Sequence, residues 1–380
     1  MKRNVLLTAS TDSHILNFHL PYIQAFVQQG WQVDVACKGT RQIPGARRVI
    51  QVPFEKSMSS PRNFAAMVQL RRQIKQEQYD LISTHTSLAA FFTRLAVLGL
   101  RHRPVVVNTV HGYLFDDQTS AHKRQILLKA EQLTAGCTDL LLAMNRWDYD
   151  TAVRYHLGKN VCLIPGMGVD FSRFSASTSD RRTLREQLGF DQDDFLFVYA
   201  AEFSKRKNQG DLIRTLPLVP EQIKLLLPGE GQLRDACMAL AQELGVSHRV
   251  VFPGQIREMA PWYAAADGAV SSSRSEGLPF NLMESMYFGL PILASEVKGH
   301  TDLITNGETG LLYPYGDTKA CAAGMNLLYR DRELGTRLSQ NEQEAVRQYD
   351  LERVLPQVLA HYVEYFPELA DAPGVTSNVP

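Results

Sequence analysis

Two glutamates stand eight residues apart in the segment 276–284, EGLPFNLME, which follows a predicted strand and opens a predicted helix. Pro279 suits the first helical turn, where its missing N–H needs no partner. Three N–H groups at this helix start are then left without helical partners, those of Phe280, Asn281 and Leu282. Such a helix start binds anions, phosphate above all, while Glu276 and Glu284 can accept hydrogen bonds from sugar hydroxyls. Helix capping with a solvated face explains the same spacing equally well.

A run of three cations, Lys205, Arg206 and Lys207, follows the predicted strand 195–200 and precedes a predicted helix. Consecutive cations at the carboxyl end of a strand fit the binding of a diphosphate. A solvated loop is the ordinary interpretation of an isolated charge run. The triplet 229–231, GEG, also follows a strand, but one GxG is weak evidence for any ligand.

His111 lies in the segment 109–112, TVHG, again directly after a predicted strand. Gly112 permits close backbone approach, and His111 could contact a substrate hydroxyl or carry a proton. A lone histidine is more often structural. The segment 8–14, TASTDSH, follows the first strand without the glycine fingerprint of dinucleotide-binding folds, which counts against a dehydrogenase.

Two DxD triplets, at 148–150 and 191–193, could suggest a metal–nucleotide site. The first opens a predicted helix, where aspartate is favoured by capping and by the helix dipole. The second lies in a polar turn before a strand. We therefore expect no metal at either triplet.

Short apolar runs alternate with amphipathic stretches, the pattern of parallel sheets that are covered by helices on both faces. The expected strands of the first half are 5–9, 33–37, 81–84, 105–109, 140–143 and 161–164. The helices expected between them are 14–29, 65–78, 88–99, 123–133 and 148–155.

After a polar segment at 172–180, which has the composition of a linker, the alternation restarts. The strands expected there are 195–200, 223–228, 250–252, 268–271 and 292–295. The helices are 209–216, 233–244, 259–265 and 279–288, with a last one at 351–366. The chain thus predicts two doubly wound α/β units with a cleft between them, and chemistry at the carboxyl ends of their strands.

The composition excludes several classes of protein. The chain has 380 residues, 44% hydrophobic and 21% charged, which predicts about two domains and excludes a disordered or fibrous protein. No run of 18 uncharged apolar residues exists, and the best candidate, 88–100, is interrupted by Arg94. The short apolar start reads as a strand, not a secretory signal. The five cysteines are scattered, so we expect neither disulfides nor a zinc site, and a reducing cytoplasmic compartment.

The net charge of zero hides an asymmetry between the two halves. Residues 1–175 hold 21 lysines and arginines against 12 acidic residues, and residues 176–380 hold 19 against 28. A basic half favours an anionic membrane surface, a nucleic acid or a phosphorylated substrate, with random surface variation as the alternative.

Taken together, the motifs resemble those of the retaining glycosyltransferases of family 4, which have the GT-B architecture. The likeness extends over essentially the whole chain. The segments that carry it are TVHGYLF (109–115), IPGMGVDFSRF (164–174), AEFSKRKNQ (201–209), LLPGEGQL (226–233), LGVSHRVVFPGQ (244–255), YAAADGAVSSSRSEGLPFNLMESMYFGLPILAS (263–295) and NGETGLLYP (306–314). The opening, HILNFHLPYIQAFVQQGWQVDVA, is similar to the branch that builds bacterial exopolysaccharide, capsule and O-antigen units.

The resemblance implies an α/β chain of GT-B type, with two doubly wound Rossmann-like domains and an interdomain cleft. Residues 1–175 would bind the acceptor and residues 176–350 the nucleotide-sugar. Residues 351–380 would form a helix that returns to the N-terminal domain, followed by a tail.

The resemblance also implies roles for single residues. Glu276 would contact the donor sugar, Lys207 would hold the diphosphate, and His111 would meet the donor sugar near the reacting carbon, which makes these three the catalytic candidates. Glu284 would bind the ribose. The other donor-binding candidates are Lys205, Arg206, Gly229, Gly254, Gln255, Gly277, Leu278, Pro279, Phe280, Asn281 and Leu282. The acceptor-side candidates are Ser13, His14 and Asn17.

Two positions depart from the family's pattern. Many members carry arginine about five residues before the lysine, where this chain has Glu202, so the phosphate charge must be met by Lys207 with Lys205 or Arg206. Many also carry a pair of glycines after the first strand, where this chain has STDS at 10–13.

The expected function is transfer of a hexosyl or N-acetylhexosaminyl unit from a UDP-sugar to a lipid-linked or growing polysaccharide acceptor. We expect retention through a same-face mechanism, no cofactor and no metal. The basic N-terminal half would contact the anionic inner face of the plasma membrane peripherally, and no nucleic acid is expected as a partner. A sugar-phosphate epimerase or phosphorylase of the same fold and a non-catalytic sugar-binding protein are the alternatives; the first would usually need a pyridoxal lysine and the second an export signal.

Overall fold

The computed structural model describes residues 2–174 and 181–375. The chain forms two compact units. The first unit comprises residues 1–168 with 351–380, and the second unit comprises residues 169–350.

The first unit is built on a seven-stranded parallel sheet with the order β3-β2-β1-β4-β5-β6-β7. In the interior strand β1 (Asn4–Thr11), Val5 pairs with Val33 on one side and with Leu81 on the other. A strand with neighbours on both sides and helices on both faces is buried throughout, so its sequence is a continuous apolar run. The strands are β1 (Asn4–Thr11), β2 (Gln32–Lys38), β3 (Arg48–Gln51), β4 (Leu81–His85), β5 (Val105–Val110), β6 (Leu140–Ala143) and β7 (Asn160–Leu163).

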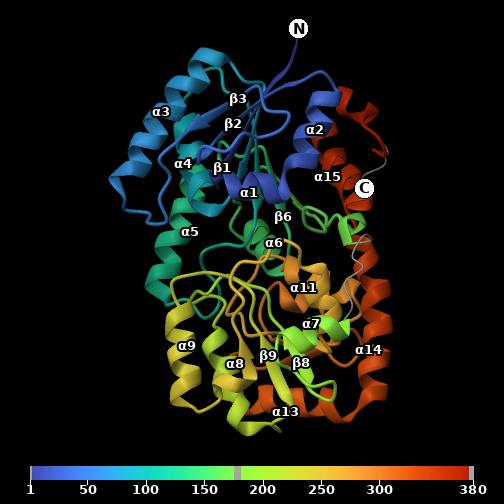
Figure 1. Ribbon diagram of the computed structural model, residues 1–380. Helices are drawn as coiled ribbons and strands as arrows, with labels where there is room; N and C mark the ends of the chain where they lie inside the picture. The colour runs from blue at the N-terminus through green and yellow to red at the C-terminus, as the bar shows by residue number, and fades with distance from the viewer. Residues whose placement is uncertain (1, 175–180, 376–380) are drawn as a thin grey trace. The chain divides into compact units, whose positions relative to one another are not determined.

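Helices cover this sheet. Figure 1 shows α3, α4 and α5 side by side on one flank of the first unit, and α2 beside α15 on the other, where Phe26 and Tyr362 are in ring contact. The helices are α1 (Asp12–Phe18), α2 (Leu20–Gln28), α3 (Pro61–Glu77), α4 (Ser87–Val97), α5 (Ala121–Ala135), α6 (Arg146–Arg154) and α15 (Leu351–Val363), with the 3-10 helix η5 (Pro367–Asp371).

The single helix expected over 14–29 is wrong, because the chain turns at His19 between α1 and α2. Pro21 lies in the first turn of α2, where a residue without an N–H costs no helical hydrogen bond. Because Pro21 has no N–H to donate to the preceding turn, a continuous helix would be interrupted at this point. The apolar residues keep their helical spacing on both sides of the break, which is why the sequence pattern did not reveal it.

The second unit has a six-stranded parallel sheet with the order β10-β9-β8-β11-β12-β13. Its strands are β8 (Phe195–Val198), β9 (Ile223–Leu226), β10 (Val250–Val251), β11 (Gly268–Ser271), β12 (Ile292–Ser295) and β13 (Leu311–Tyr313). Its helices are α7 (Arg181–Gln187), α8 (Gln209–Thr215), α9 (Arg234–Glu243), α10 (Ala260–Ala265), α11 (Phe280–Tyr287), α12 (His300–Leu303), α13 (Thr318–Arg330) and α14 (Arg332–Ala345). Short 3-10 helices are η1 (Phe171–Phe174), η2 (Leu216–Leu218), η3 (Ser247–Arg249) and η4 (Val346–Tyr349).

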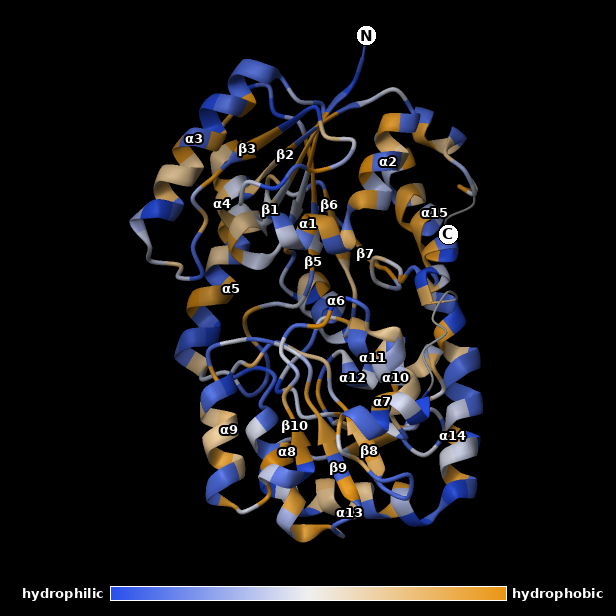
Figure 2. Cartoon of the chain, viewed as in Figure 1, coloured by the Kyte–Doolittle hydropathy of each residue, from blue (hydrophilic) through white to orange (hydrophobic). Residues whose placement is uncertain are grey.

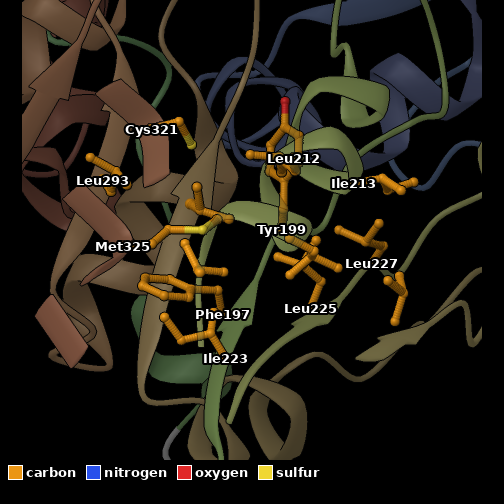
Figure 3. Packing of buried hydrophobic residues seen from close by; sticks show 14 of the residues in the cluster. Phe197, Tyr199, Leu212, Ile213, Ile223, Leu225, Leu227, Leu293, Cys321 and Met325 are labelled. Atoms are coloured by element: carbon orange, nitrogen blue, oxygen red, sulfur yellow. The ribbon is translucent and has the colours of Figure 1, made fainter. Parts of the chain in front are cut away.

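The core of the second unit lies between its sheet and the helices α8 and α13. Figure 3 shows Phe197 and Leu225 of the sheet packed with Leu212 of α8 and Met325 of α13, all fully buried. Figure 2 shows β8 and β9 as largely apolar, whereas α14 is mostly polar. The strands therefore carry the apolar surface that holds the loops at their carboxyl ends in place.

Some elements lie outside those expected from the sequence. They are β3, β13, α7, α12, α13 and α14. The segment expected as a linker, 172–180, begins within η1 of the second unit, and its remainder from 175 lies outside the described residues. All five cysteines are free thiols, as expected. Within the described residues no helix is long and apolar enough to cross a membrane.

Candidate active site

Glu276 lies in the loop after β11 and is 6% exposed. Lys207 donates from Nζ to Glu276 Oε1 at 2.5 Å, and Arg206 donates from Nη1 to Glu276 Oε2 at 2.6 Å. The two cations follow β8, and the strand order of the sheet reverses between β8 and β11. Open α/β sheets bind ligands at such a switch point, beyond the carboxyl ends of the strands. The structure thus brings together three residues that the sequence placed in two separate motifs.

Two serines that follow β11 directly fix this arrangement. Ser273 donates from Oγ to Glu276 Oε1 at 2.5 Å and shares a hydrogen bond of 2.6 Å with the hydroxyl of Tyr199. Ser272 donates from Oγ to the carbonyl oxygens of Lys207 and Asn208, at 3.1 and 2.9 Å. Figure 3 shows the Tyr199 ring within the hydrophobic cluster, with its hydroxyl at the far end. These hydrogen bonds tie the loop after β8 to the loop after β11, and Tyr199 anchors both loops in the core.

The two cations set the charge state of Glu276. Burial alone would raise the pKa of Glu276, but Lys207 and Arg206 outweigh it and hold that pKa well below its ordinary value. The carboxylate is therefore ionised at physiological pH. The Lys207 side chain is only 12% exposed, whereas that of Arg206 is 51% exposed. The ammonium group of Lys207 is therefore held in one position. The Arg206 side chain is exposed enough to rotate toward another anion.

Gly299 and His300, which starts α12, lie close to Glu276, and no local pattern in the sequence pointed to either of them. The His300 ring bonds through Nδ1 to the Ser295 carbonyl at 2.7 Å, and through Nε2 to Ser271 Oγ at 3.2 Å. Burial lowers the pKa of His300 to about 4, so the ring is neutral. Gly299 has a φ of 82°, and a Cβ there would lie 2.8 Å from the Cβ of Glu276. A side chain at Gly299 would displace the glutamate.

Glu284, the second glutamate of the motif, lies on α11. It accepts a hydrogen bond of 2.7 Å from the Tyr263 hydroxyl at Oε2 and forms an ion pair with Arg173 at Oε1. Burial raises the pKa of Glu284, against the opposing effect of Arg173. The Glu284 side chain is 12% exposed and that of Arg173 is 49% exposed. Both partners lay outside the expected site residues, because they come from η1 and α10, far from Glu284 in sequence.

The start of α11 differs from the expectation in one respect. Pro279 is the N-cap residue rather than the first helical residue. Leu282 donates its N–H to the Pro279 carbonyl at 3.2 Å, so the prediction of three unpartnered N–H groups is wrong at Leu282. No side-chain hydrogen bond caps the helix at Pro279.

The other predicted donor-binding residues surround the same sheet edge. Gly277, Leu278 and Pro279 are buried in the Glu276 loop, while Phe280 and Asn281 are half-buried at the start of α11. Gly229 N donates to the Gly254 carbonyl at 2.8 Å, which ties the loop after β9 to the loop after β10. A Cβ on Gly229 would lie 2.1 Å from the Ala201 carbonyl oxygen, so this crossing requires glycine. Lys205 and Gln255 are exposed, and their proposed contacts stay predictions.

His111 is not a lone histidine. In the first unit its ring lies 4.7 Å from that of His14, 5.6 Å from that of His19 and 5.5 Å from that of His85, measured between centroids. Burial lowers the pKa of each of these histidines, to about 4 for His14. The cluster is therefore neutral at physiological pH. The contact of His111 with a donor sugar stays a prediction.

The other acceptor-side candidates lie on α1. Ser13 accepts a hydrogen bond from Arg41, which also forms an ion pair of 2.7 Å with Asp12. Asn17 is exposed. Arg41 thus holds the segment 10–13 in place, where many members of the family carry a pair of glycines.

The two DxD triplets differ in their surroundings. Asp148 is buried in the first turn of α6, where it accepts hydrogen bonds from Asn145 Nδ2 at 2.7 Å and from Tyr113 N at 3.4 Å. Asp191 and Asp193 are exposed in a turn before β8. Within the described residues, the group whose atoms could surround an ion is His14, His19 and His111.

Two units that are each built on a parallel sheet make up the fold of GT-B enzymes. In this chain the second unit has a carboxylate and two cations at its switch point. Residues 22–173 match the model of Glycosyltransferase Family 4, and residues 180–345 match that of Glycosyl transferases group 1. A protein of Bacillus subtilis that is named as a glycosyltransferase, EpsD, is 33% identical over 96% of this chain and 97% of its own length. The chain belongs to glycosyltransferase family 4 and is a transferase, as its motifs predict.

More distant relatives agree with this family. The UDP-Gal:alpha-D-GlcNAc-diphosphoundecaprenol alpha-1,3-galactosyltransferase of Escherichia coli is 23% identical over 80% of this chain and 82% of its own length. The crystal structure of HepE from Anabaena, in complex with UDP and glucose, covers 95% of this chain and 100% of its own, with a TM-score of 0.78 and 20% identity. This likeness confirms the expected fold of two Rossmann-like domains.

Proposed function

We propose that this chain transfers a sugar from a UDP-sugar to a lipid-linked or growing polysaccharide acceptor, with retention at the anomeric carbon. The second unit would bind the donor and the first unit the acceptor. The observation that carries the proposal is the contact of Lys207 and Arg206 with Glu276 at the switch point of the second sheet. HepE, which shares the fold, was solved with UDP and glucose, and the Escherichia coli relative is named for a UDP-sugar and a diphosphoundecaprenol acceptor.

The cations suit the leaving group of this reaction. Cleavage of the anomeric carbon–oxygen bond leaves negative charge on the departing diphosphate and positive charge on the sugar ring. Groups fixed in advance at the place where charge develops lower the barrier, by roughly 3–4 kcal/mol for one donor. Lys207 is held in place by Glu276, and Arg206 supplies the second cation that other members take from the position of Glu202. We infer that these cations, and no metal, neutralise the diphosphate.

The surroundings of Glu276 support a same-face mechanism. A double displacement would need a carboxylate oxygen that is free to attack the anomeric carbon. Glu276 Oε1 accepts from Lys207 and Ser273, and Oε2 accepts from Arg206. A carboxylate engaged in this way is a poor nucleophile, so we assign Glu276 to orienting the cations and the donor sugar.

Glu284 would bind the ribose of the donor. A carboxylate can accept hydrogen bonds from both hydroxyls of a ribose. Tyr263 holds one oxygen of Glu284 and, being buried, would stay in place. Arg173 is half exposed and would release the other oxygen when the ribose arrives.

The activity is tested by incubating the full chain with a panel of radiolabelled nucleotide-sugars and with lipid extracted from membranes. Label from one UDP-sugar should enter the lipid or polysaccharide fraction with the anomeric configuration kept. Release of UDP without transfer of label, or label from a sugar phosphate without UDP, would favour the epimerase or phosphorylase instead. Binding without turnover of any donor would favour a sugar-binding protein.

We also propose that the first unit contacts an anionic membrane surface through α3 and α5. One face of α3 carries four residues at helical spacing, namely Phe64, Val68, Arg72 and Lys75. Phe64 is 51% exposed. A face of α5 likewise carries three exposed residues at helical spacing, namely Ile126, Lys129 and Leu133. Apolar side chains flanked by lysine and arginine are typical of surfaces that dock on anionic lipid.

Some of the cations expected at this surface are engaged within the unit. Arg71 donates to the carbonyl oxygens of Ala96 and Leu98, and Arg103 forms an ion pair with Asp139. The exposed cations are Arg62, which forms an ion pair with Glu55, and Arg72, Lys75, Arg101, Lys123 and Lys129. At about 1 kcal/mol for each cation near anionic lipid, these suffice for reversible docking.

A further inference from the structure

Four histidines meet at the carboxyl ends of neighbouring strands in the first unit. His14 and His19 follow β1, His85 ends β4 and His111 follows β5. The strand order of this sheet reverses between β1 and β4, so the cluster lies at the switch point, where open α/β sheets bind ligands. The His19 and His85 rings are 3.8 Å apart between centroids, and those of His14 and His19 are 5.1 Å apart.

Three nitrogens of this cluster are buried without a hydrogen-bond partner. They are Nε2 of His14 and both Nδ1 and Nε2 of His19, and His19 is fully buried. Buried polar atoms in native proteins nearly always have a partner, and those that do not call for an unseen ligand or a functional explanation. Several unpartnered imidazole nitrogens that converge on one point have the chemistry of a metal site.

We propose that His14, His19 and His111 bind one divalent transition-metal ion, with Zn²⁺ as the ion that fits best. One ring nitrogen from each residue lies within 4.8 Å of the other two. Zinc–nitrogen bonds are about 2.0–2.1 Å long, which places tetrahedral ligand atoms roughly 3.4 Å apart. Small rotations of the rings would therefore close the site around an ion.

The composition of the site favours zinc over harder cations. Three imidazoles suit Zn²⁺ and its transition-metal neighbours, whereas Mg²⁺ and Ca²⁺ prefer oxygen ligands. The nearby carboxylate of Asp12 is engaged with Arg41 and does not join the three nitrogens. Three protein ligands leave a fourth position for water or a substrate oxygen, as in catalytic zinc sites.

His85 is a positioning residue for this site. Its Nδ1 lies 3.3 Å from His111 Nε2, which leaves the other nitrogen of His111 for the ion. His85 Nε2 in turn lies 3.0 Å from Ser83 Oγ, and Ser83 bonds to the hydroxyl of Tyr362 on α15 at 3.3 Å. Partners of this kind orient metal-binding histidines and fix their tautomer. This chain of contacts runs from the core of the unit to the proposed ion.

The site was invisible in the sequence because its ligands have no metal-binding spacing. It does not depend on the proposed sugar transfer, because metal binding is measured without any donor or acceptor. It also leaves the diphosphate cations in the second unit unchanged.

The test is zinc binding by the full chain after removal of metals with a chelator and dialysis. Zinc is titrated in competition with a chromogenic chelator, and the bound metal is counted by mass spectrometry. The wild-type chain should bind one Zn²⁺ in this titration, and His14→Gln and His111→Gln should weaken binding by more than 100-fold. His85→Gln should weaken it by roughly 10–100-fold, as loss of an outer partner usually does. His102→Gln, at an exposed histidine outside the cluster, should bind as the wild type does.

Two further readings separate a lost ligand from a lost fold. Zinc should raise the Tm of the wild-type chain and of His102→Gln, because an ion that binds only the folded state stabilises it. It should not raise the Tm of folded His14→Gln. Cobalt should give the visible absorption of a four-coordinate ion in the wild type and in His102→Gln, but not in His14→Gln or His111→Gln. A metal-free wild-type chain that binds no zinc in the titration, or a His14→Gln variant that binds it as tightly as the wild type, overturns the proposal.

Discussion

Lys207 Nζ lies 2.5 Å from Glu276 Oε1, although the two residues follow different strands of the second sheet. Arg206 occupies the other oxygen of the same carboxylate. One buried acid therefore sets the position of two cations at the place where this fold binds ligands.

Glu276→Gln should lower kcat by roughly 100–1000-fold, in the range seen when one preorganised electrostatic group is lost. The amide keeps the shape of the side chain but no longer holds Lys207 and Arg206 by charge. Single-turnover rates at saturating donor measure the effect, with far-ultraviolet circular dichroism as a check of folding. Glu202→Gln is the matched control, since Glu202 is exposed nearby. Equal rates for Glu276→Gln and the control would refute the role of Glu276.

Glu284→Gln and Arg173→Ala should change UDP binding in different directions. A hydrogen bond to a charged group contributes about 1.5–3 kcal/mol, so Glu284→Gln should raise the Kd for UDP by roughly 10–100-fold. Arg173→Ala removes a group that competes with the ribose for Glu284, so its Kd should be equal or lower. Isothermal titration calorimetry with UDP measures both. Tighter binding by Glu284→Gln would contradict the ribose contact.

Sugar transfer should proceed without added Mg²⁺ or Mn²⁺, because Lys207 and Arg206 meet the diphosphate charge. The doubly substituted variant Asp191→Asn, Asp193→Asn should keep the wild-type rate, since both residues lie in an exposed turn. Initial rates with and without each ion decide the matter. The opposite result would be a strict requirement for either ion, together with loss of the ion-dependent activity in this variant. That result would place a metal at the second DxD triplet.

Binding to anionic vesicles should depend on the face of α3. Phe64→Ser combined with Lys75→Glu removes an apolar side chain and reverses a charge on that face. Flotation with vesicles rich in phosphatidylglycerol should show wild-type binding that falls as salt rises, and clearly weaker binding of the variant. Leu327→Ser, an exposed apolar residue of α13 in the second unit, is the control and should float as the wild type does. Equal flotation with neutral vesicles would exclude the electrostatic contact.

Glu342 should make the chain less stable as pH rises. Burial raises the pKa of Glu342 to about 8 from its ordinary 4.5, and its Oε2 has no partner. Between these two pKa values the folded state keeps a proton that the unfolded state releases. The free energy of unfolding therefore falls with increasing pH, by about 1.4 kcal/mol per pH unit from this group.

Glu342→Gln should remove that dependence and keep the hydrogen bond of 3.0 Å from Ile292 N, because an amide oxygen accepts as well. Urea unfolding at pH 5, 6, 7 and 8 measures the free energy of both chains. The gap between variant and wild type should widen in favour of the variant as pH rises. Parallel pH profiles would show that Glu342 is ionised in the folded state.

Local sequence patterns predicted every strand of the two sheets except β3 and β13, and they predicted the loops that carry the chemistry. The apolar runs at 5–9, 140–143 and 292–295 are strands because a parallel strand is buried on both faces and needs no alternation. Glu276 and Lys207 were placed after strands for the same reason. Family 4 was recognisable because its motifs are local segments whose residues stand in a fixed order.

The tertiary structure alone decided which of these segments meet. Strand order is a product of long-range packing, so no local pattern predicts that β8 lies beside β11 and brings Lys207 to Glu276. Arg173 and Tyr263 reach Glu284 from separate elements for the same reason. The histidine cluster is the sharpest case, because His14 and His111 have no meaningful spacing along the chain. The free energy that holds them together comes from the buried sheet beneath them, and that sheet forms only when the whole unit folds.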